Sequence, residues 1–163
     1  MSTTTTAHAT LRGGKYLTFN LGREGYGIPI GKVRSIIGYM DITSVPRTPG
    51  HVKGVINLRG QVISVVDLRT KLSMESAERT DETCIIVVET QRGGRTICTG
   101  IIVDKVSEVP QIAEDSIEDA PAFGSGVDTQ FILGMAKIGS AVKILLDIDK
   151  IIGGEELSLA EAA

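Results

Sequence analysis

The sequence predicts a mainly β protein made of two small, similar domains in tandem. Its apolar stretches are short, rich in β-branched residues and bounded by glycine, proline or aspartate, which is typical of strands. The pattern of the first half of the chain also recurs in the second half. Only residues 32–37 and 155–163 have a helical pattern, and we expect short helices there.

Seven stretches are predicted to be β-strands, because each concentrates β-branched and apolar residues between turn-forming residues. In chain order they are YLTFNL (16–21), YGIPI (26–30), HVKGVINL (51–58), QVISVVDL (61–68), TCIIVVET (83–90), TICTGIIV (96–103) and AVKILLDI (141–148). Gly22 and Gly25 lie in the turn between the first two strands. Residues 91–94 form the turn of a predicted hairpin between the fifth and sixth strands.

Two blocks of the chain are repeated in the same order. GIPIGKVRSI (27–36) aligns without gaps on GIIVDKVSEV (100–109), and GVINLRGQVISVVDLRTKL (54–72) aligns on GMAKIGSAVKILLDIDKII (134–152). A period this long indicates duplicated domains rather than a solenoid.

Each copy has enough strands for one small closed sheet. A sheet of about five strands closes most economically into a barrel of the SH3 type, which hides its edges. We therefore expect two tandem SH3-like five-stranded β-barrels with short helices, over residues 15–82 and 83–152. Residues 1–14 are predicted to be a disordered tail, residues 153–163 an acidic helical tail, and residues 73–82 a polar link. An exchange of strands between the barrels at the termini stays open.

The charge and hydropathy of the chain exclude several partner classes. Its 17 Lys and Arg against 20 Asp and Glu give a net charge of −3, and only 4% of its residues are aromatic, so neither a phosphate backbone nor stacked bases would bind well. No apolar run approaches the ~20 residues that a membrane span needs, and the start of the chain is polar where a signal peptide would be apolar. We expect a cytoplasmic protein without a nucleic-acid partner or direct membrane insertion.

Residues that could carry catalysis or bind a metal are scarce. His8 and His51 are the only histidines, and the sequence indicates no serine or cysteine nucleophile and aspartate that would form a catalytic triad with either. Cys84 and Cys98 lack the spacing of zinc ligands and are expected to be buried free thiols, although their predicted hairpin does not exclude a bridge. The residues therefore predict no catalytic site, no metal site and no cofactor.

The acidic residues are expected to have structural roles. Asp67 and Asp147 end equivalent strands in the two copies, and a residue duplicated in this way is expected to cap or terminate its strand. The acidic run at residues 113–121 is expected to be a solvated loop. A hydrolase that uses Asp67 or Asp104 is kept as a rival hypothesis.

The turn at residues 58–61 (LRGQ) differs from its equivalent at residues 138–141 (IGSA), because only the first contains an arginine. Gly60 is expected to provide the positive φ that a tight hairpin turn needs. Arg59 has two possible roles, a solvated turn residue or a binding anchor, and Asn57 beside it could donate and accept hydrogen bonds.

Several motifs together resemble the CheW family of bacterial chemotaxis coupling proteins over residues 15–152. The motifs are YGIPIGKVRSIIGY, VPRTPGHVKGVINLRGQVISVVDLR, GIIVDKVSEV and ILLDIDKII. The resemblance implies two intertwined SH3-like barrels and no enzymatic activity. It also implies an adaptor between the cytoplasmic tips of methyl-accepting chemotaxis receptors and the regulatory domain of the histidine kinase CheA, recruited to receptor arrays at the membrane.

The resemblance further implies two contact surfaces. The helical tip of the receptor would dock in a groove between the barrels, at Asn57, Arg59, Gly60, Ile30, Val33 and Ile85. The kinase would contact Val33, Ile36, Ile37, Thr43, Ser44 and Val45. Two alternatives to the chemotaxis adaptor stay open: a kinase-binding scaffold of a non-chemotaxis signalling system with the same fold, and a small RNA-binding barrel.

Overall fold

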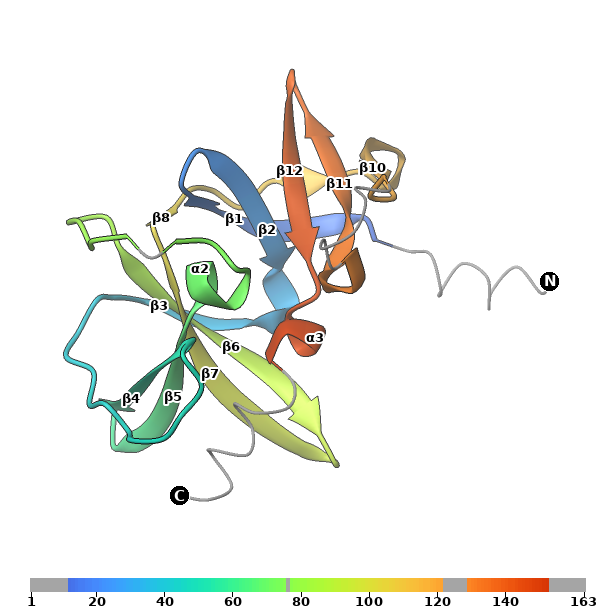
Figure 1. Cartoon of the computed structure of the whole chain (residues 1–163). Helices are drawn as coiled ribbons and strands as arrows, with labels where there is room; N and C mark the ends of the chain where they lie inside the picture. The colour runs from blue at the N-terminus through green and yellow to red at the C-terminus, as the bar shows by residue number, and fades with distance from the viewer. Residues whose placement is uncertain (1–11, 76, 122–128, 153–163) are drawn as a thin grey trace.

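The computed structural model describes residues 12–75, 77–121 and 129–152, which form two β-sheets with a few short helices (Figure 1). The seven-stranded sheet consists of β1 (Gly14–Leu21), β2 (Glu24–Pro29), β8 (Lys105–Val106), β9 (Gln111–Ile112), β10 (Ile117–Glu118), β11 (Ile132–Ile138) and β12 (Ala141–Leu146). The five-stranded sheet consists of β3 (Val33–Gly38), β4 (Val52–Leu58), β5 (Gln61–Asp67), β6 (Cys84–Arg92) and β7 (Arg95–Val103). The helices are η1 (Ile30–Lys32), α2 (Leu68–Lys71), η2 (Glu114–Ser116), η3 (Thr129–Phe131) and α3 (Ile148–Ile152). These two sheets agree with the predicted mainly β fold of two SH3-like barrels.

Each sheet combines strands from both halves of the chain. The seven-stranded sheet has the order β10-β11-β12-β2-β1-β8, with β9 also paired to β1, and the five-stranded sheet has the order β3-β6-β7-β5-β4. In Figure 1 the blue hairpin β1–β2 accordingly lies beside the orange-red hairpin β11–β12. A division of the sheets at residue 82 is therefore wrong, and strands are exchanged between the halves. The repeated hairpins explain the error, because a hairpin can pair with an equivalent strand of either half.

The chain passes between the sheets at two equivalent places. The first crossing is η1, between β2 and β3, and the second crossing is Asp104, between β7 and β8. These crossings lie inside the aligned blocks 27–36 and 100–109, so the repeat in the sequence marks the passage from one sheet to the other.

One large apolar cluster, here called the shared core, joins the two sheets. Its buried members are Leu17, Phe19, Leu21, Ile28, Leu68, Ile86, Val88, Ile101, Val103, Leu146, Ile148, Ile151 and Ile152. They come from strands of both sheets and from α2 and α3, which cover the junction. Burying apolar surface of this kind stabilises the fold by about 25 cal/mol per Å², so the two sheets are held together by packing as well as by the chain.

The helix predicted at residues 32–37 is wrong. Only the single turn of η1 is helical there, and β3 follows at once. Ile36 points outward and Ile37 packs on a cluster inside the five-stranded sheet, which is the alternation of a strand. The helical tail expected at residues 153–163 lies outside the described residues.

Asp67 and Asp147 each lie at the end of a strand, as their duplication predicts, and each also caps a short helix that was not predicted. The Asp67 carboxylate accepts a hydrogen bond from the Arg69 amide at 3.1 Å, and the Asp147 carboxylate accepts one from the Lys150 amide at 3.3 Å. Such caps satisfy amides at the start of a helix that have no partner within it. The two aspartates therefore end their strands and begin α2 and α3.

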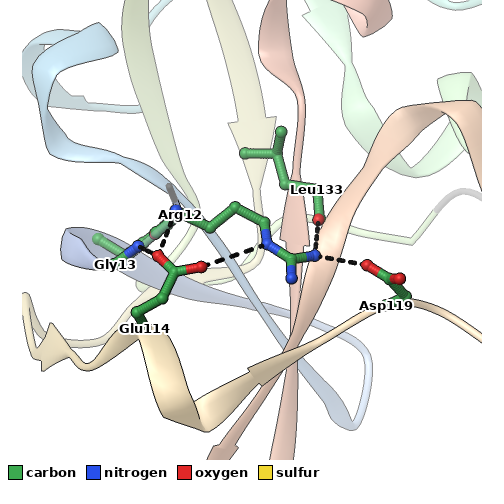
Figure 2. Close-up of polar contacts among 6 residues, drawn as sticks. Arg12, Gly13, Glu114, Asp119 and Leu133 are labelled. Atoms are coloured by element: carbon green, nitrogen blue, oxygen red, sulfur yellow. Dashed lines mark hydrogen bonds and ion pairs between the residues drawn. The ribbon is translucent and has the colours of Figure 1, made fainter. Parts of the chain in front are cut away.

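The start of β1 is fixed by the acidic segment that was expected to be a solvated loop (Figure 2). One Glu114 oxygen accepts hydrogen bonds from the Arg12 and Gly13 amides at 2.6 and 2.7 Å. The Arg12 guanidinium donates to Asp119 at 2.8 Å and to the Leu133 carbonyl at 3.0 Å. Residues 12–14 thus do not belong to a disordered tail, whereas residues 1–11 lie outside the described part of the chain.

The two cysteines are free thiols, as expected, but they are half-buried instead of buried. The β6–β7 hairpin pairs Cys84 with Val103 and Cys98 with Glu89, which places the two thiols about 17 Å apart along the strands. A bridge between them is excluded by this register. Within the described residues, no helix is both long enough and apolar enough to cross a membrane.

Candidate functional site

The tip of the β4–β5 hairpin is a two-residue turn. Leu58 pairs with Gln61, and the two residues between them, Arg59 and Gly60, have φ values of 54° and 87°. Two successive left-handed residues are typical of the type I′ turn, whose twist matches that of the flanking strands. The structure therefore places the left-handed conformation at Arg59 as well as at the expected Gly60.

Asn57 takes part in this turn. Its side-chain oxygen accepts a hydrogen bond from the Gly60 amide at 2.8 Å. The amide would otherwise have no backbone partner at the tip, because the ladder ends at the pair of Leu58 and Gln61. The Asn57 side chain is thus engaged within the hairpin.

Arg59 has a conformation that a glycine would adopt more easily. A left-handed conformation costs a residue with a side chain about 1–2 kcal/mol. The equivalent position in the β11–β12 hairpin is Gly139, with a φ of 63°. Arg59 is exposed and forms no hydrogen bond or ion pair with any other described residue. A strained conformation combined with an unpaired guanidinium favours a binding anchor over a solvated turn residue.

The other predicted receptor residues lie elsewhere. Ile30 is 37% exposed in η1, and Val33 begins β3 and packs partly against the shared core. Ile85 is 0% exposed, so it cannot form part of a docking surface, and its inclusion in the receptor site is wrong. It lies in β6, an interior strand, where a Cβ at Gly100 would be only 2.8 Å from its methyl group. A continuous apolar run such as TCIIVV has no alternation that would reveal which face is covered.

Val62 is a surface residue that the sequence analysis did not select. It is 64% exposed and pairs with Asn57 across the hairpin, so the two side chains share one face. The sequence did contain a signal for this residue, because Val62 lies next to the predicted turn and aligns with a valine at position 142. The hairpin tip thus carries an apolar side chain close to its cation.

The predicted kinase residues are divided between two parts of the five-stranded sheet. Ile36 is 44% exposed on β3, at one edge, whereas Val33 and Ile37 on the same strand are half-buried and pack on apolar clusters. Thr43 pairs through its backbone with Val55 of β4, at the other edge. Ser44 is exposed and Val45 is half-buried. The exposed members of the set are thus Ile36, Thr43 and Ser44.

An ion pair holds the second crossing. The Arg69 guanidinium of α2 donates from Nε and Nη2 to the two Asp104 oxygens, at 2.9 and 2.6 Å. The Gly22 amide, in the turn between β1 and β2, also donates to Asp104 at 2.7 Å. The hydrogen bonds from Arg69 hold the pKa of Asp104 below its ordinary value, and those to Asp104 raise the pKa of Arg69. A helix on the five-stranded sheet and a turn of the seven-stranded sheet therefore share one carboxylate.

The first crossing has an ion pair of the opposite polarity. Lys32 of η1 lies 2.7 Å from Asp149 of α3. Asp149 of α3 is equivalent to Arg69 of α2 in the aligned blocks. At the first crossing α3 provides the anion, and at the second crossing α2 provides the cation. The two crossings are related by the repeat, and their charges are reversed.

Comparison with known proteins agrees with this architecture. The family model of the CheW-like domain matches residues 15–156. The chain therefore belongs to the CheW-like family. A chemotaxis protein CheW of Klebsiella aerogenes is 38% identical over 149 residues, covering 91% of this chain and 87% of the relative, and one of Rhizobium meliloti is 31% identical over 153 residues, covering 94% and 96%.

A solved structure supports the same assignment. The scaffolding protein TtCheW of Thermoanaerobacter tengcongensis superposes with a TM-score of 0.77 at 33% identity, and the match covers 89% of this chain and 96% of that one. The predicted membership of the CheW family and the predicted role as a chemotaxis coupling adaptor are confirmed by these relatives.

The polar hollows of this CheW-like chain lie away from the hairpin tip. Two overlapping hollows of about 290 and 470 Å³ share Arg69, Ala77, Glu78, Thr83 and Asp104 in their walls. Neither is lined by a predicted receptor or kinase residue. Their cations and anions are mixed, and this charge pattern selects no ligand class.

The residues proposed for a hydrolase are occupied by structural contacts. Asp67 caps α2, and Asp104 is paired with Arg69, which keeps it ionised. A carboxylate pair for acid–base catalysis needs one member with a raised pKa, whereas the pKa of Asp104 is lowered. Among the described residues, no group of histidine, cysteine and acidic side chains could hold a metal ion.

Proposed function

We propose that this chain is a non-enzymatic adaptor that binds the regulatory domain of the histidine kinase CheA and the cytoplasmic tips of methyl-accepting chemotaxis receptors. The observation that carries the receptor contact is the exposed, left-handed Arg59 at the hairpin tip, which pairs with no other described residue. The named relatives are chemotaxis proteins and a scaffolding protein, which supports the same role. By binding receptors, the adaptor is recruited to arrays at the membrane.

The receptor contact is centred on Arg59. Its planar guanidinium provides a fork of donors for carbonyl or carboxylate oxygens at the tip of a helical hairpin, while its aliphatic stem covers apolar surface. Arginine is enriched among interface residues whose truncation weakens binding strongly. Asn57 and Gly60 belong to the same tip, and Ile30 at the first crossing adds an exposed aliphatic side chain.

The kinase contact uses exposed residues at the two edges of the five-stranded sheet, away from the turn at Arg59. Ile36 is the exposed aliphatic residue of β3, and Thr43 and Ser44 are exposed beside β4. A partner that covers Ile36 removes apolar surface from water, which favours binding. Val33 and Ile37 hold β3 on the apolar clusters behind it, and Val45 follows Ser44 as a half-buried residue.

The adaptor acts by fixing the positions of its two partners. Arg59 at the β4–β5 turn and Ile36 on β3 belong to one five-stranded sheet, which is joined to the other sheet through the shared core. A change in receptor conformation therefore changes the position of the kinase, because the adaptor between them does not deform. The effect is a coupling free energy between two binding sites.

Replacing Arg59 tests this function. Arg59→Ala is expected to weaken binding to a receptor tip fragment about tenfold or more, the size of an interface hot spot, with unchanged binding to the kinase. Co-sedimentation with receptor fragments and kinase measures both. Arg95→Ala, which removes an exposed arginine beside the β6–β7 turn, is the matched control.

Equal receptor binding by Arg59→Ala and the wild type would defeat the proposed receptor contact. Kinase binding by the wild type without any receptor binding would instead favour a kinase scaffold of a non-chemotaxis system.

A further inference from the structure

The hydrogen bond from the Gly60 amide to Asn57 constrains the backbone next to Arg59. The Gly60 amide belongs to the peptide unit that begins at the carbonyl of Arg59, so fixing this amide also fixes ψ of Arg59. The bond is 2.8 Å long and joins residues on the two sides of the strained position. Without it, the backbone at Arg59, with its φ of 54°, would be held only by the pairing of Leu58 with Gln61.

The equivalent hairpin lacks this arrangement. Lys137 occupies the position of Asn57, and its ammonium group is paired with Glu118 at 2.6 Å. A lysine has no acceptor atom, so it cannot receive the amide of the turn. The strained position there is Gly139, which needs no support. The β4–β5 hairpin thus has both the acceptor, Asn57, and the arginine, whereas the β11–β12 hairpin has neither.

Val62 adds apolar surface on the same face. It is opposite Asn57 in the register of the hairpin, with Cβ atoms of such pairs about 5 Å apart. The Asn57 oxygen is engaged within the turn. The guanidinium of Arg59 and the methyl groups of Val62 are exposed at the tip and free to meet a partner. A helical segment with an apolar residue next to unpaired carbonyl or carboxylate oxygens complements both.

We infer that Asn57 is a positioning residue that does not contact the receptor, and that Val62 makes an apolar contact with the receptor tip beside Arg59. This inference rests on the proposed function and assigns separate roles to neighbouring residues of the same hairpin. Asn57 acts through Arg59, and Arg59 and Val62 touch the partner.

Two substitutions of Asn57 separate positioning from contact. Asn57→Ala removes the acceptor and is expected to weaken binding of a receptor tip fragment about fivefold. Asn57→Asp keeps an acceptor oxygen but has no amide donor, and it is expected to bind within about twofold of the wild type. Hydrogen exchange of the Gly60 amide is expected to be faster in Asn57→Ala than in Asn57→Asp. A general loss of stability would instead speed up the exchange of many amides.

The Val62 contact is tested against its equivalent in the other hairpin. Val62→Lys is expected to weaken receptor binding about fivefold or more, because a strongly hydrated charge replaces an apolar contact. Val142→Lys makes the same change at an equally regular strand position that is 50% exposed, and it is expected to leave receptor binding unchanged. The urea midpoints of both variants should match that of the wild type.

The outcomes distinguish this inference from the function on which it rests. If Arg59→Ala binds the receptor fragment as the wild type does, the proposed receptor contact itself is wrong. If Arg59→Ala loses binding while Asn57→Ala retains it, or Asn57→Asp loses it, the positioning role is wrong and the receptor contact stands. Equal binding by Val62→Lys and Val142→Lys would remove Val62 from the contact.

Discussion

At position 59 the chain uses an arginine where the geometry of the turn suits glycine. This arginine destabilises the folded state, since a left-handed residue with a side chain is strained by about 1–2 kcal/mol. The other hairpin avoids this cost with Gly139 at the same position. Strain that a simple substitution would relieve indicates selection for the side chain itself.

Arg59→Gly is therefore expected to separate stability from binding. The relief of strain is partly offset by the greater freedom of glycine in the unfolded chain, so the free energy of unfolding should stay equal or rise by up to about 1 kcal/mol. Receptor binding should fall as in Arg59→Ala. Urea unfolding measures the first effect, and a decrease of more than 1 kcal/mol would contradict the strain argument.

At the scale of single elements, the sequence predicted most strands and the two aspartates that end β5 and β12, but not the short helices that these aspartates cap. The seven predicted strands all overlap strands of the structure, whereas β3 was mistaken for a helix and Ile85 for a surface residue. Both errors concern apolar runs in which neighbouring residues face opposite sides, as Ile36 and Ile37 do. The tip of the β4–β5 hairpin was predictable because its turn residues are local, but the left-handed Arg59 was visible only in the backbone.

Gly54 shows why one element needs a glycine. Its φ is 147°, and a Cβ built there would lie 2.0 Å from the Thr43 carbonyl oxygen. This close approach allows Thr43 and Val55 to exchange two backbone hydrogen bonds of 2.9 Å. The segment that carries Thr43 and Ser44 can therefore pair with β4 only because Gly54 has no side chain.

Gly54→Ala is expected to lower the free energy of unfolding by about 2–3 kcal/mol, because it combines a backbone clash with a strained φ. Gly60→Ala, at a φ of 87° with open space around it, should cost about 1 kcal/mol through strain alone. Urea unfolding of the two variants side by side tests the comparison. A smaller loss for Gly54→Ala than for Gly60→Ala would contradict it.

For the molecule as a whole, the exchange of strands could not be derived from the sequence. Strand pairing is a contact between distant residues, and the repeated hairpins offer equivalent partners in both halves. The structure resolves this ambiguity with the shared core and with the two ion pairs of reversed polarity at the crossings. Arg69 and Asp104 are far apart in the chain, so their pairing had no local signal.

Asp104→Asn is expected to lower the free energy of unfolding by about 1–3 kcal/mol at neutral pH, because Arg69 and the Gly22 amide lose a charged acceptor. The pKa of Asp104 is lowered in the folded protein, so this stabilisation is present above the pKa of the unfolded chain and is lost as the pH falls through the folded value. The difference between variant and wild type should therefore shrink on acidification.

Urea unfolding of both proteins at pH 7 and at about pH 3 measures this dependence. A difference that stays constant or grows in acid would show that the charge of Asp104 is not its source.

The exchanged strands also impose an order on synthesis. The strands of the five-stranded sheet all lie between residues 33 and 103, so the ribosome can release that sheet as a unit. The hairpin β1–β2 is the first of the described strands to be translated, yet its parallel neighbour β12 is the last of them. The earliest hairpin must therefore remain beside the nascent chain with one edge open until its partner arrives.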